Sequence, residues 1–112
     1  MLPEVILVQG GPMKVRFVLA AAALAATPIT GIAQESTARA LAATCANCHG
    51  TNGRSATKDV ATLAGLPKEH IAGAMKAFKE GKRPATVMHQ LAKGYTDQQI
   101  DLIAGFFAGQ GR

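Results

Sequence analysis

The sequence predicts an all-α fold, a single small domain in which three helices and long loops surround a large bound group. Apolar residues recur at helical spacing in three segments, and no stretch shows the alternation typical of a half-buried strand. The connections are long for a chain of 112 residues, and loops of roughly 15 residues are uncommon unless they are functional or packed around something. A domain this small also buries only a modest core and often needs a cofactor, metal or disulfide for stability.

The N-terminal segment is predicted to be a secretion signal and not part of the fold. After Met13, the basic residues Lys14 and Arg16 precede a short apolar run, and small residues follow at Gly31 and Ala33. A charged start, an apolar stretch and a small-residue exit are the three parts of a signal peptide. The apolar run is shorter than the roughly 20 residues of a membrane span. We therefore expect no permanent span, with an uncleaved anchor as the alternative.

Residues 1–12 do not fit that signal, because Glu4 stands where a signal peptide carries only positive charge. Met13 is therefore the expected translation start, with an unusually long leader as the alternative. Residues 1–33 are predicted to be an N-terminal extension plus signal peptide, and residues 34–112 the exported domain. The net charge of the chain is +5, which favours acidic partner surfaces. Export and the lack of a dense basic run make nucleic acid a poor candidate partner, and we expect none.

The first helix is predicted over residues 36–46, which are rich in alanine and free of glycine and proline. Three residues at its start are candidates for the N-cap: Glu35, Ser36 and Thr37. Its apolar stripe consists of Ala38, Leu41, Ala42 and Cys45. A loop rich in glycine and threonine follows over residues 50–65.

The second helix is predicted within LPKEHIAGAMKAFKEG. Pro67 suits its first position and Gly81 its C-terminal stop. Its apolar face consists of Ile71, Ala74, Met75 and Phe78. The segment RPATVMHQLAKG then reads as a loop with room for one short helical piece.

The third helix, DQQIDLIAGFFA, has the clearest start. Thr96 and Gln99 have the spacing of a capping box, and Tyr95 and Ile100 occupy the two positions of a hydrophobic staple. Its apolar residues are Ile100, Ile103, Phe106 and Phe107.

The segment CANCHG, residues 45–50, contains both cysteines of the chain, and His49 directly follows the second. C-x-x-C-H is the attachment signature of c-type haem: two thiols add to the vinyl groups on one edge of the porphyrin, and the adjacent imidazole reaches the iron. A Cys45–Cys48 disulfide would close too short a loop to stabilise distant parts of the chain. The motif therefore predicts one covalent haem c held by Cys45 and Cys48, with His49 as an iron ligand.

Three other interpretations of the motif are open on the residues alone. A zinc site would need two histidines in addition to the cysteines, and none of the three in the chain has finger-like spacing. A thioredoxin-like dithiol would start a helix within a βαβ unit, whereas this motif follows a helix and no strand precedes it. The third interpretation is that the two cysteines have a purely structural role. Export favours haem, since c-type haem is attached outside the cytoplasm.

The second axial position of the iron has four candidates. Met88 follows Pro84 in an irregular stretch, where a loop can direct its thioether across the haem. Met75 lies on an apolar helix face that suits core packing, His70 suits a solvated helix start, and His89 would give bis-histidine ligation or face solvent. We predict Met88. His/Met ligation raises the reduction potential relative to bis-histidine ligation and leaves no open coordination site, so the protein is predicted to transfer electrons and not to be an enzyme. A ligand-binding haem sensor is the alternative if Met88 does not coordinate.

CANCHG, LAGLP and FKEGKRPATVMHQLAKGYTDQQIDLIAGFFA together resemble a class I c-type cytochrome. Residues 63–108 are most similar to the monohaem cytochrome subunit of flavocytochrome c sulfide dehydrogenases and to cytochrome c4 modules. The resemblance implies a cytochrome c-like fold in which the first and last helices cross. The residues it assigns are Cys45 and Cys48 as thioether positions, His49 as proximal ligand, Met88 as distal ligand and Tyr95 near the distal side.

One position departs from the family pattern. Such proteins usually carry a proline two residues before the leucine of the LAG segment, and its carbonyl accepts a hydrogen bond from the proximal imidazole. This chain has Ala61 there. We expect the Ala61 carbonyl to accept that bond, in a loop that lacks the stiffness of proline.

The resemblance implies a periplasmic subunit that accepts electrons from a sulfide-oxidising flavoprotein. A free-standing shuttle for another dehydrogenase or a terminal oxidase is the alternative. A permanent subunit needs a large apolar interface, whereas a shuttle needs a small basic one. Basic residues cluster in sequence around the distal segment, either as a solvated face or as a docking rim for an acidic partner. They are Lys76, Lys79, Lys82, Arg83 and Lys93.

Overall fold

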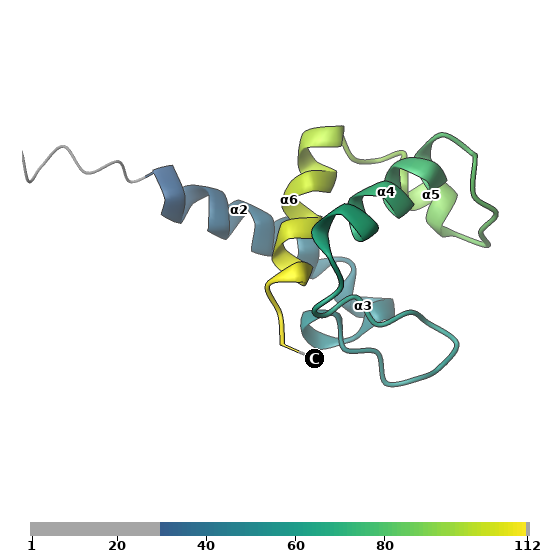
Figure 1. Ribbon diagram of the computed structural model, residues 1–112, viewed down its shortest axis with the longest axis horizontal. Coiled ribbons are helices and arrows are strands. Elements are labelled where there is room, and N and C mark those ends of the chain that lie inside the picture. The colour runs from purple at the N-terminus through teal and green to yellow at the C-terminus, as the bar shows by residue number, and fades with distance from the viewer. Residues whose placement is uncertain (1–29, 112) are drawn as a thin grey trace, which may run out of the picture. The chain divides into compact units, whose positions relative to one another are not determined.

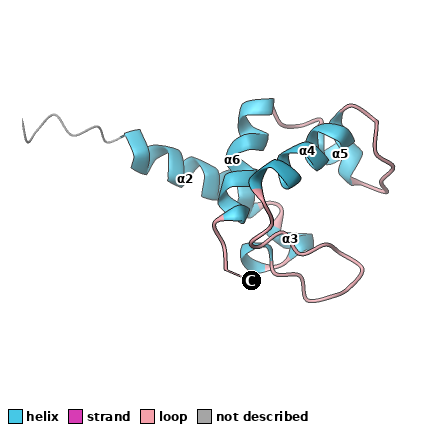
Figure 2. Ribbon diagram, viewed as in Figure 1, coloured by secondary structure: helices cyan, strands magenta, loops and turns pink. Residues whose placement is uncertain are grey.

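A computed structural model of the chain describes residues 30–111, and this part is helical without any strand. The elements in order are α2 (Thr30–Ala43), α3 (Ala46–His49), the 3₁₀ helix η1 (Thr51–Gly53), α4 (Lys68–Lys79), α5 (Met88–Ala92) and α6 (Asp97–Ala108) (Figure 1, Figure 2). The helices α2, α4 and α6 are the three long helices expected from the sequence, so the all-α prediction is confirmed. Most of the predicted signal lies outside the described residues, and its boundary at residue 33 stays a prediction.

Helix α2 begins earlier than the sequence suggested. It already includes Thr30, the first described residue, well before Ser36, and the hydroxyls of Ser36 and Thr37 donate to the carbonyl of Ala33 inside the helix. The prediction that these residues cap the helix was therefore wrong, because an alanine-rich segment propagates across polar residues that can bond back to the preceding turn. The helix ends at Ala43, and a turn at Thr44 and Cys45 separates it from α3.

Helix α4 begins one residue later than expected and ends as expected. Pro67 is the N-cap, with an extended ψ of 138°, and not the first helical residue. At the other end, Gly81 has a φ of +72°, the N–H of Lys82 donates to Ala77 and that of Gly81 donates to Phe78. These two bonds form a Schellman motif, which needs a residue that tolerates the left-handed region.

Helix α6 has the predicted start. The Thr96 hydroxyl accepts from the N–H of Gln99, and the Gln99 side chain accepts from the N–H of Thr96. The capping box is therefore confirmed. Tyr95 and Ile100, the two staple positions, both belong to the main hydrophobic cluster.

The core lies mainly between α4 and α6. Its members include Ile71 and Met75 on α4, and Ile100, Ile103 and Phe107 on α6. Two ion pairs border this contact, Lys76 with Asp101 and Lys79 with Asp97, each at 3.1 Å. Because the later residue on α4 pairs with the earlier one on α6, the two helices run antiparallel.

Helix α2 passes across α6 (Figure 1), as the family resemblance implied. Ala38 and Ala42, one turn apart, are buried, and Ala42 belongs to the main hydrophobic cluster. The guanidinium of Arg39 lies 5.8 Å from the centroid of the Phe106 ring on α6. Leu41 is partly buried against the core.

The segment from Gly50 to Leu66 is irregular apart from η1, as expected. The carbonyl of Gly53 accepts from the N–H groups of Leu63 and Ala64 and closes the base of the loop. Gly53 has a φ of +80°, and a Cβ there would lie 2.7 Å from Cδ1 of Phe107. Only glycine lets the loop approach α6 this closely.

Candidate functional site

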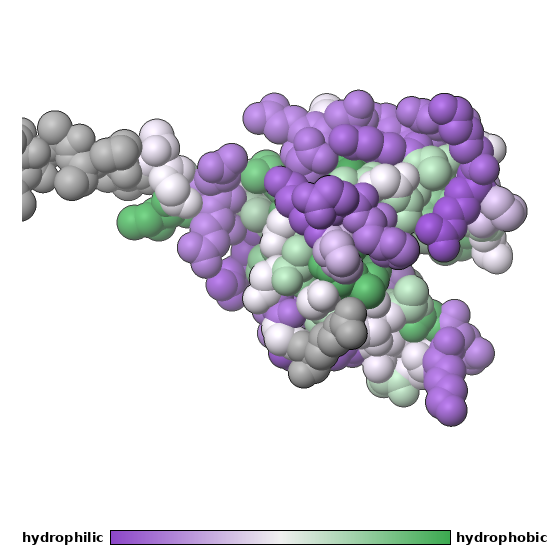
Figure 3. Space-filling model, in the orientation of Figure 1, coloured by the Kyte–Doolittle hydropathy of each residue, from purple (hydrophilic) through white to green (hydrophobic). Residues whose placement is uncertain are grey.

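One cavity of about 530 Å³ lies between the α2–α3 turn, the Gly50–Leu66 loop, α4 and the segment leading into α5. Most of its walls are apolar side chains from all of these elements. The space-filling view shows a hollow that opens at one side of the molecule, with neutral and apolar residues around it (Figure 3). A concave, mostly apolar cavity with a few polar groups is typical of a cofactor site.

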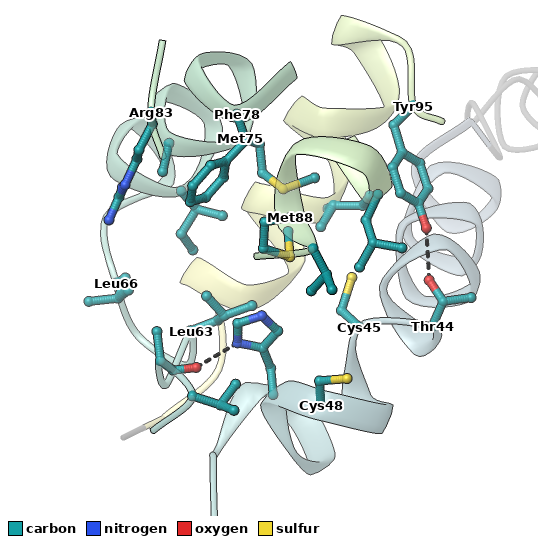
Figure 4. Close-up of a pocket in the computed structure, with 18 of the residues that line it drawn as sticks. Thr44, Cys45, Cys48, Leu63, Leu66, Met75, Phe78, Arg83, Met88 and Tyr95 are labelled. Atoms are coloured by element: carbon teal, nitrogen blue, oxygen red, sulfur yellow. Dashed lines mark hydrogen bonds between the residues drawn. The ribbon is translucent and has the colours of Figure 1, made fainter. Parts of the chain in front are cut away.

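His49 ends helix α3 and lines this cavity. Its Nδ1 lies 2.6 Å from the carbonyl oxygen of Ala61, a hydrogen bond drawn as a dashed line in Figure 4. Since a carbonyl can only accept, Nδ1 carries the proton and Nε2 has a free lone pair, as a metal-ligating histidine requires. Alanine thus supplies the carbonyl that a proline supplies in the family pattern.

Cys45 and Cys48 lie on one side of the cavity (Figure 4). Both are free thiols, Cys45 partly buried and Cys48 exposed. Burial raises the pKa of the Cys45 thiol above its ordinary value, against a smaller lowering by the hydrogen bond with Thr44. The turn before α3 and the short helix itself therefore bring two thiols and one imidazole to the same cavity.

Met88 is the first residue of the short helix α5, and its thioether lies in the middle of the cavity view, between Met75 and the cysteines (Figure 4). The other candidates differ in position. Met75 touches the cavity but is a 7% exposed member of the core. His70 lies at the exposed start of α4 and also lines the cavity, whereas His89 does not.

The residues present fit one covalently bound haem. Two free thiols, an imidazole nitrogen and a thioether converge on an apolar space. The thiols would attach a c-type haem, and the imidazole and the thioether would be its two axial ligands. Among the described residues, no three side chains of histidine, cysteine, aspartate or glutamate converge as a metal-ion site would require. The zinc interpretation of the motif therefore has no support in the geometry.

Sequence reasoning missed several parts of this site. The hydroxyls of Thr44 and Tyr95 are 2.8 Å apart although 51 residues separate them in sequence, and both line the cavity (Figure 4). Apolar wall residues from the irregular stretches were not singled out either: Leu63, Leu66, Val87 and Leu91. Periodicity carries no signal for such residues, because each comes from a loop or a single helical turn.

The basic residues around the distal segment are mostly paired. Lys76 and Lys79 bind aspartates on α6, and Lys82 lies 2.7 Å from Glu80, whose hydrogen bond raises the pKa of Lys82. Arg83 differs, because its guanidinium carbon lies 4.9 Å from the centroid of the Phe78 ring. The cluster seen in sequence is therefore partly neutralised by local acidic residues.

The fold and the cavity define a small helical protein built around one covalently held haem. The chain belongs to the cytochrome c family, whose family model matches residues 35–109. It is therefore an electron-transfer protein. That family binds haem c covalently, and the two cysteines of this chain, in C-x-x-C-H spacing, fit one such haem.

Several characterised proteins are similar to this chain. The cytochrome subunit of sulfide dehydrogenase from Chlorobaculum tepidum is 42% identical over 83 residues, covering 74% of each chain. Cytochrome c4 from Pseudomonas aeruginosa is 36% identical over 64% of this chain and 36% of its own length. A thiosulfate dehydrogenase electron acceptor from Thiomonas intermedia is 33% identical over 86% of this chain and 45% of its own length. This chain thus matches less than half of the latter two proteins.

None of the helices within residues 30–111 is long and apolar enough to cross a bilayer.

Proposed function

We propose that this protein is a periplasmic electron carrier whose single haem c is attached through Cys45 and Cys48 and ligated by His49 and Met88. The convergence of these four side chains on one apolar cavity is the observation that carries the proposal. The haem supplies the one-electron chemistry. The protein holds both axial donors, excludes water with apolar walls, and orients His49 through the Ala61 carbonyl.

The ligand assignment is tested by the absorption spectrum of the holoprotein. Met88→Ala is expected to remove the weak far-red band that a thioether ligand gives ferric haem, and to let the ferrous protein bind carbon monoxide. Met75→Leu is the matched control, because it replaces the other thioether that touches the cavity with a side chain of similar volume.

The control is expected to keep the band and to exclude carbon monoxide. Loss of the band in Met75→Leu but not in Met88→Ala would transfer the ligand role to Met75. If the wild-type protein lacks the band and His89→Ala changes its absorption spectrum, the ligand would be His89 instead.

We further propose that the donor of electrons is a sulfide-oxidising flavoprotein of which this chain is the cytochrome subunit. The similarity to a sulfide dehydrogenase cytochrome subunit over 74% of both chains supports this partner. The charges near the distal segment also support a stable subunit. Three lysines there are paired with acidic residues of the same chain, which leaves less free positive charge to guide a transient partner.

A free-standing shuttle is the second candidate. The similarity to a thiosulfate dehydrogenase electron acceptor over 86% of this chain favours it. Such a carrier docks transiently through a small interface, and its rate of reduction falls with ionic strength when charged residues guide the encounter.

Purification of the exported protein from its own cells distinguishes the two. We expect a flavin-containing complex that stays together through size-exclusion chromatography and reduces the haem on addition of sulfide. A monomer that is reduced by several dehydrogenases, at rates that fall with salt, would contradict the subunit proposal and support the shuttle.

The predicted signal peptide supports a periplasmic location. Residues 30–37 of α2 are all exposed, and the first buried residue of the helix is Ala38. Removal of the chain up to Ala33 would therefore take no buried side chain of the described part away from the core.

A further inference from the structure

We propose that Arg83 binds a propionate group of the haem and that Phe78 holds its guanidinium in place for this contact. The inference rests on the proposed attachment of haem at Cys45 and Cys48, and it adds a residue that neither the motif nor the ligand set assigns.

The positions of the cysteines decide which end of the cavity receives the propionates. Thioether bonds form at the vinyl groups of haem, and the two propionates lie on the opposite edge of the macrocycle. The cysteines lie at one side of the cavity, whereas Leu66 and Arg83 lie across it (Figure 4). Two carboxylates must therefore face the side on which Arg83 lies.

Arg83 is the one lysine or arginine side chain, among the described residues, that lines this cavity. Lys76, Lys79 and Lys82 have acidic partners, but Arg83 forms no ion pair within residues 30–111. Its guanidinium instead lies over the Phe78 ring at 4.9 Å, and Phe78 also lines the cavity (Figure 4). A stacked guanidinium keeps its N–H donors free at its edge, and their fork geometry matches a carboxylate.

Apart from Arg83, the proposed haem-binding residues and the Thr44–Tyr95 pair, the polar side chains that line this cavity are Asp59, His70 and Thr86. The carboxylate of Asp59, on the Gly50–Leu66 loop, would repel a propionate, and His70 on α4 offers a further nitrogen donor. The permanent charge of Arg83 therefore supplies a cation in a cavity whose lining also contains a carboxylate.

The contact between Arg83 and the propionate would also fix the position of the segment that contains Met88. Between Arg83 and His89, no backbone N–H donates to a backbone carbonyl within the described part of the chain. A bond from Arg83 to the haem would hold this segment at a point five positions before Met88. Arg83 would then act on the iron through charge and through the position of its distal ligand.

Two substitutions that each remove one positive charge, Arg83→Gln and Lys82→Gln, test the proposal in the holoprotein. Arg83→Gln is expected to lower the midpoint potential, because a nearby cation favours ferrous over ferric iron. It is also expected to make the potential fall as pH rises through the pKa of the propionate, which lies above the roughly 4 of an ordinary carboxyl once the cation that keeps it ionised is lost. Arg83→Lys keeps the charge without the fork and should show a smaller change. Lys82→Gln, adjacent in sequence but absent from the cavity lining, is the matched control and should leave both properties unchanged.

Asp59→Asn and His70→Gln, each made in the Arg83→Gln protein, assign the new titration. It should persist in both if the propionate is the titrating group, and its loss in either would contradict the proposal. Equal shifts in Arg83→Gln and Lys82→Gln, or no shift in Arg83→Gln, would also overturn it. The pyridine haemochrome spectrum and the far-red band of each variant report separately on haem attachment and Met88 ligation, so a failure of the proposed function is recognised independently.

Discussion

The α4–α6 helix pair and the walls of the haem cavity both contain many apolar side chains, but they bury them against different partners. Ile100, Ile103 and Phe107 on α6 are at most 1% exposed because they pack on other protein atoms. Val87 and Leu91 beside the cavity are more than half exposed in the protein alone. One region is therefore stabilised by its own side chains, and the other depends on a bound group for the same purpose.

Phe107 connects these two regions. Its side chain belongs to the helix-pair core, and its Cδ1 also approaches Gly53 at the base of the cavity loop. Its carbonyl accepts from the N–H of Gly65, 2.9 Å away, at the other end of the same loop. The helix pair thus provides a rigid base on which the cavity wall rests.

Removing the haem is expected to have the largest effect. The double variant Cys45→Ala/Cys48→Ala would leave the cavity without its covalent occupant, so that its apolar wall side chains face water. Burial of one such side chain contributes about 1.5–3 kcal/mol, and the whole stability of a small domain is only about 5–15 kcal/mol. Circular dichroism of the haem-free variant should show no cooperative thermal transition.

A cooperative transition in that variant, with helix content close to that of the holoprotein, would contradict the dependence of the cavity walls on haem. Wild-type holoprotein melted under the same conditions is the control.

Phe107→Ala tests the other region. Truncation of this fully buried ring is expected to lower the free energy of unfolding by about 3–5 kcal/mol, measured by denaturant titration of the holoprotein. Phe106→Ala, a change of equal size at a partly exposed ring, should cost less. Equal losses in the two variants would show that burial in the helix pair is not the determining factor.

Thr96→Ala is expected to have the smallest effect. It removes the capping box of α6 and should cost about 1 kcal/mol, while the far-red band and the midpoint potential stay unchanged because Thr96 does not line the cavity. Thr37→Ala on the exposed face of α2 is the control and should change stability by less than about 0.5 kcal/mol. A shifted potential in Thr96→Ala would mean that the two regions are less separate than their contacts indicate.

Features with strong local sequence signals were predicted correctly, whereas the cavity walls were not predicted. The start of α6 and the end of α4 were correct to the residue, because a capping box and a C-terminal glycine are local signals that act within one turn. The predicted start of α2 at Ser36 was wrong, because the helix already includes the residues from Thr30 on, and an alanine-rich segment offers several weak starts and no strong one. The partner of Tyr95 and the cavity walls around Leu63 and Leu66 had no local signal at all.

The sequence by itself determined the all-α class, the three long helices and the identity of the haem-binding motif. Each depends on residues close together in the chain, where periodicity, capping and the spacing of two thiols and an imidazole are local properties. Only the tertiary structure decided that the Ala61 carbonyl meets His49, that Met88 and not His89 lines the cavity, and that Arg83 lies across it from the cysteines. These positions depend on how helices and loops pack around a shared space. Residues far apart in the chain meet there, and no local sequence pattern predicts such contacts.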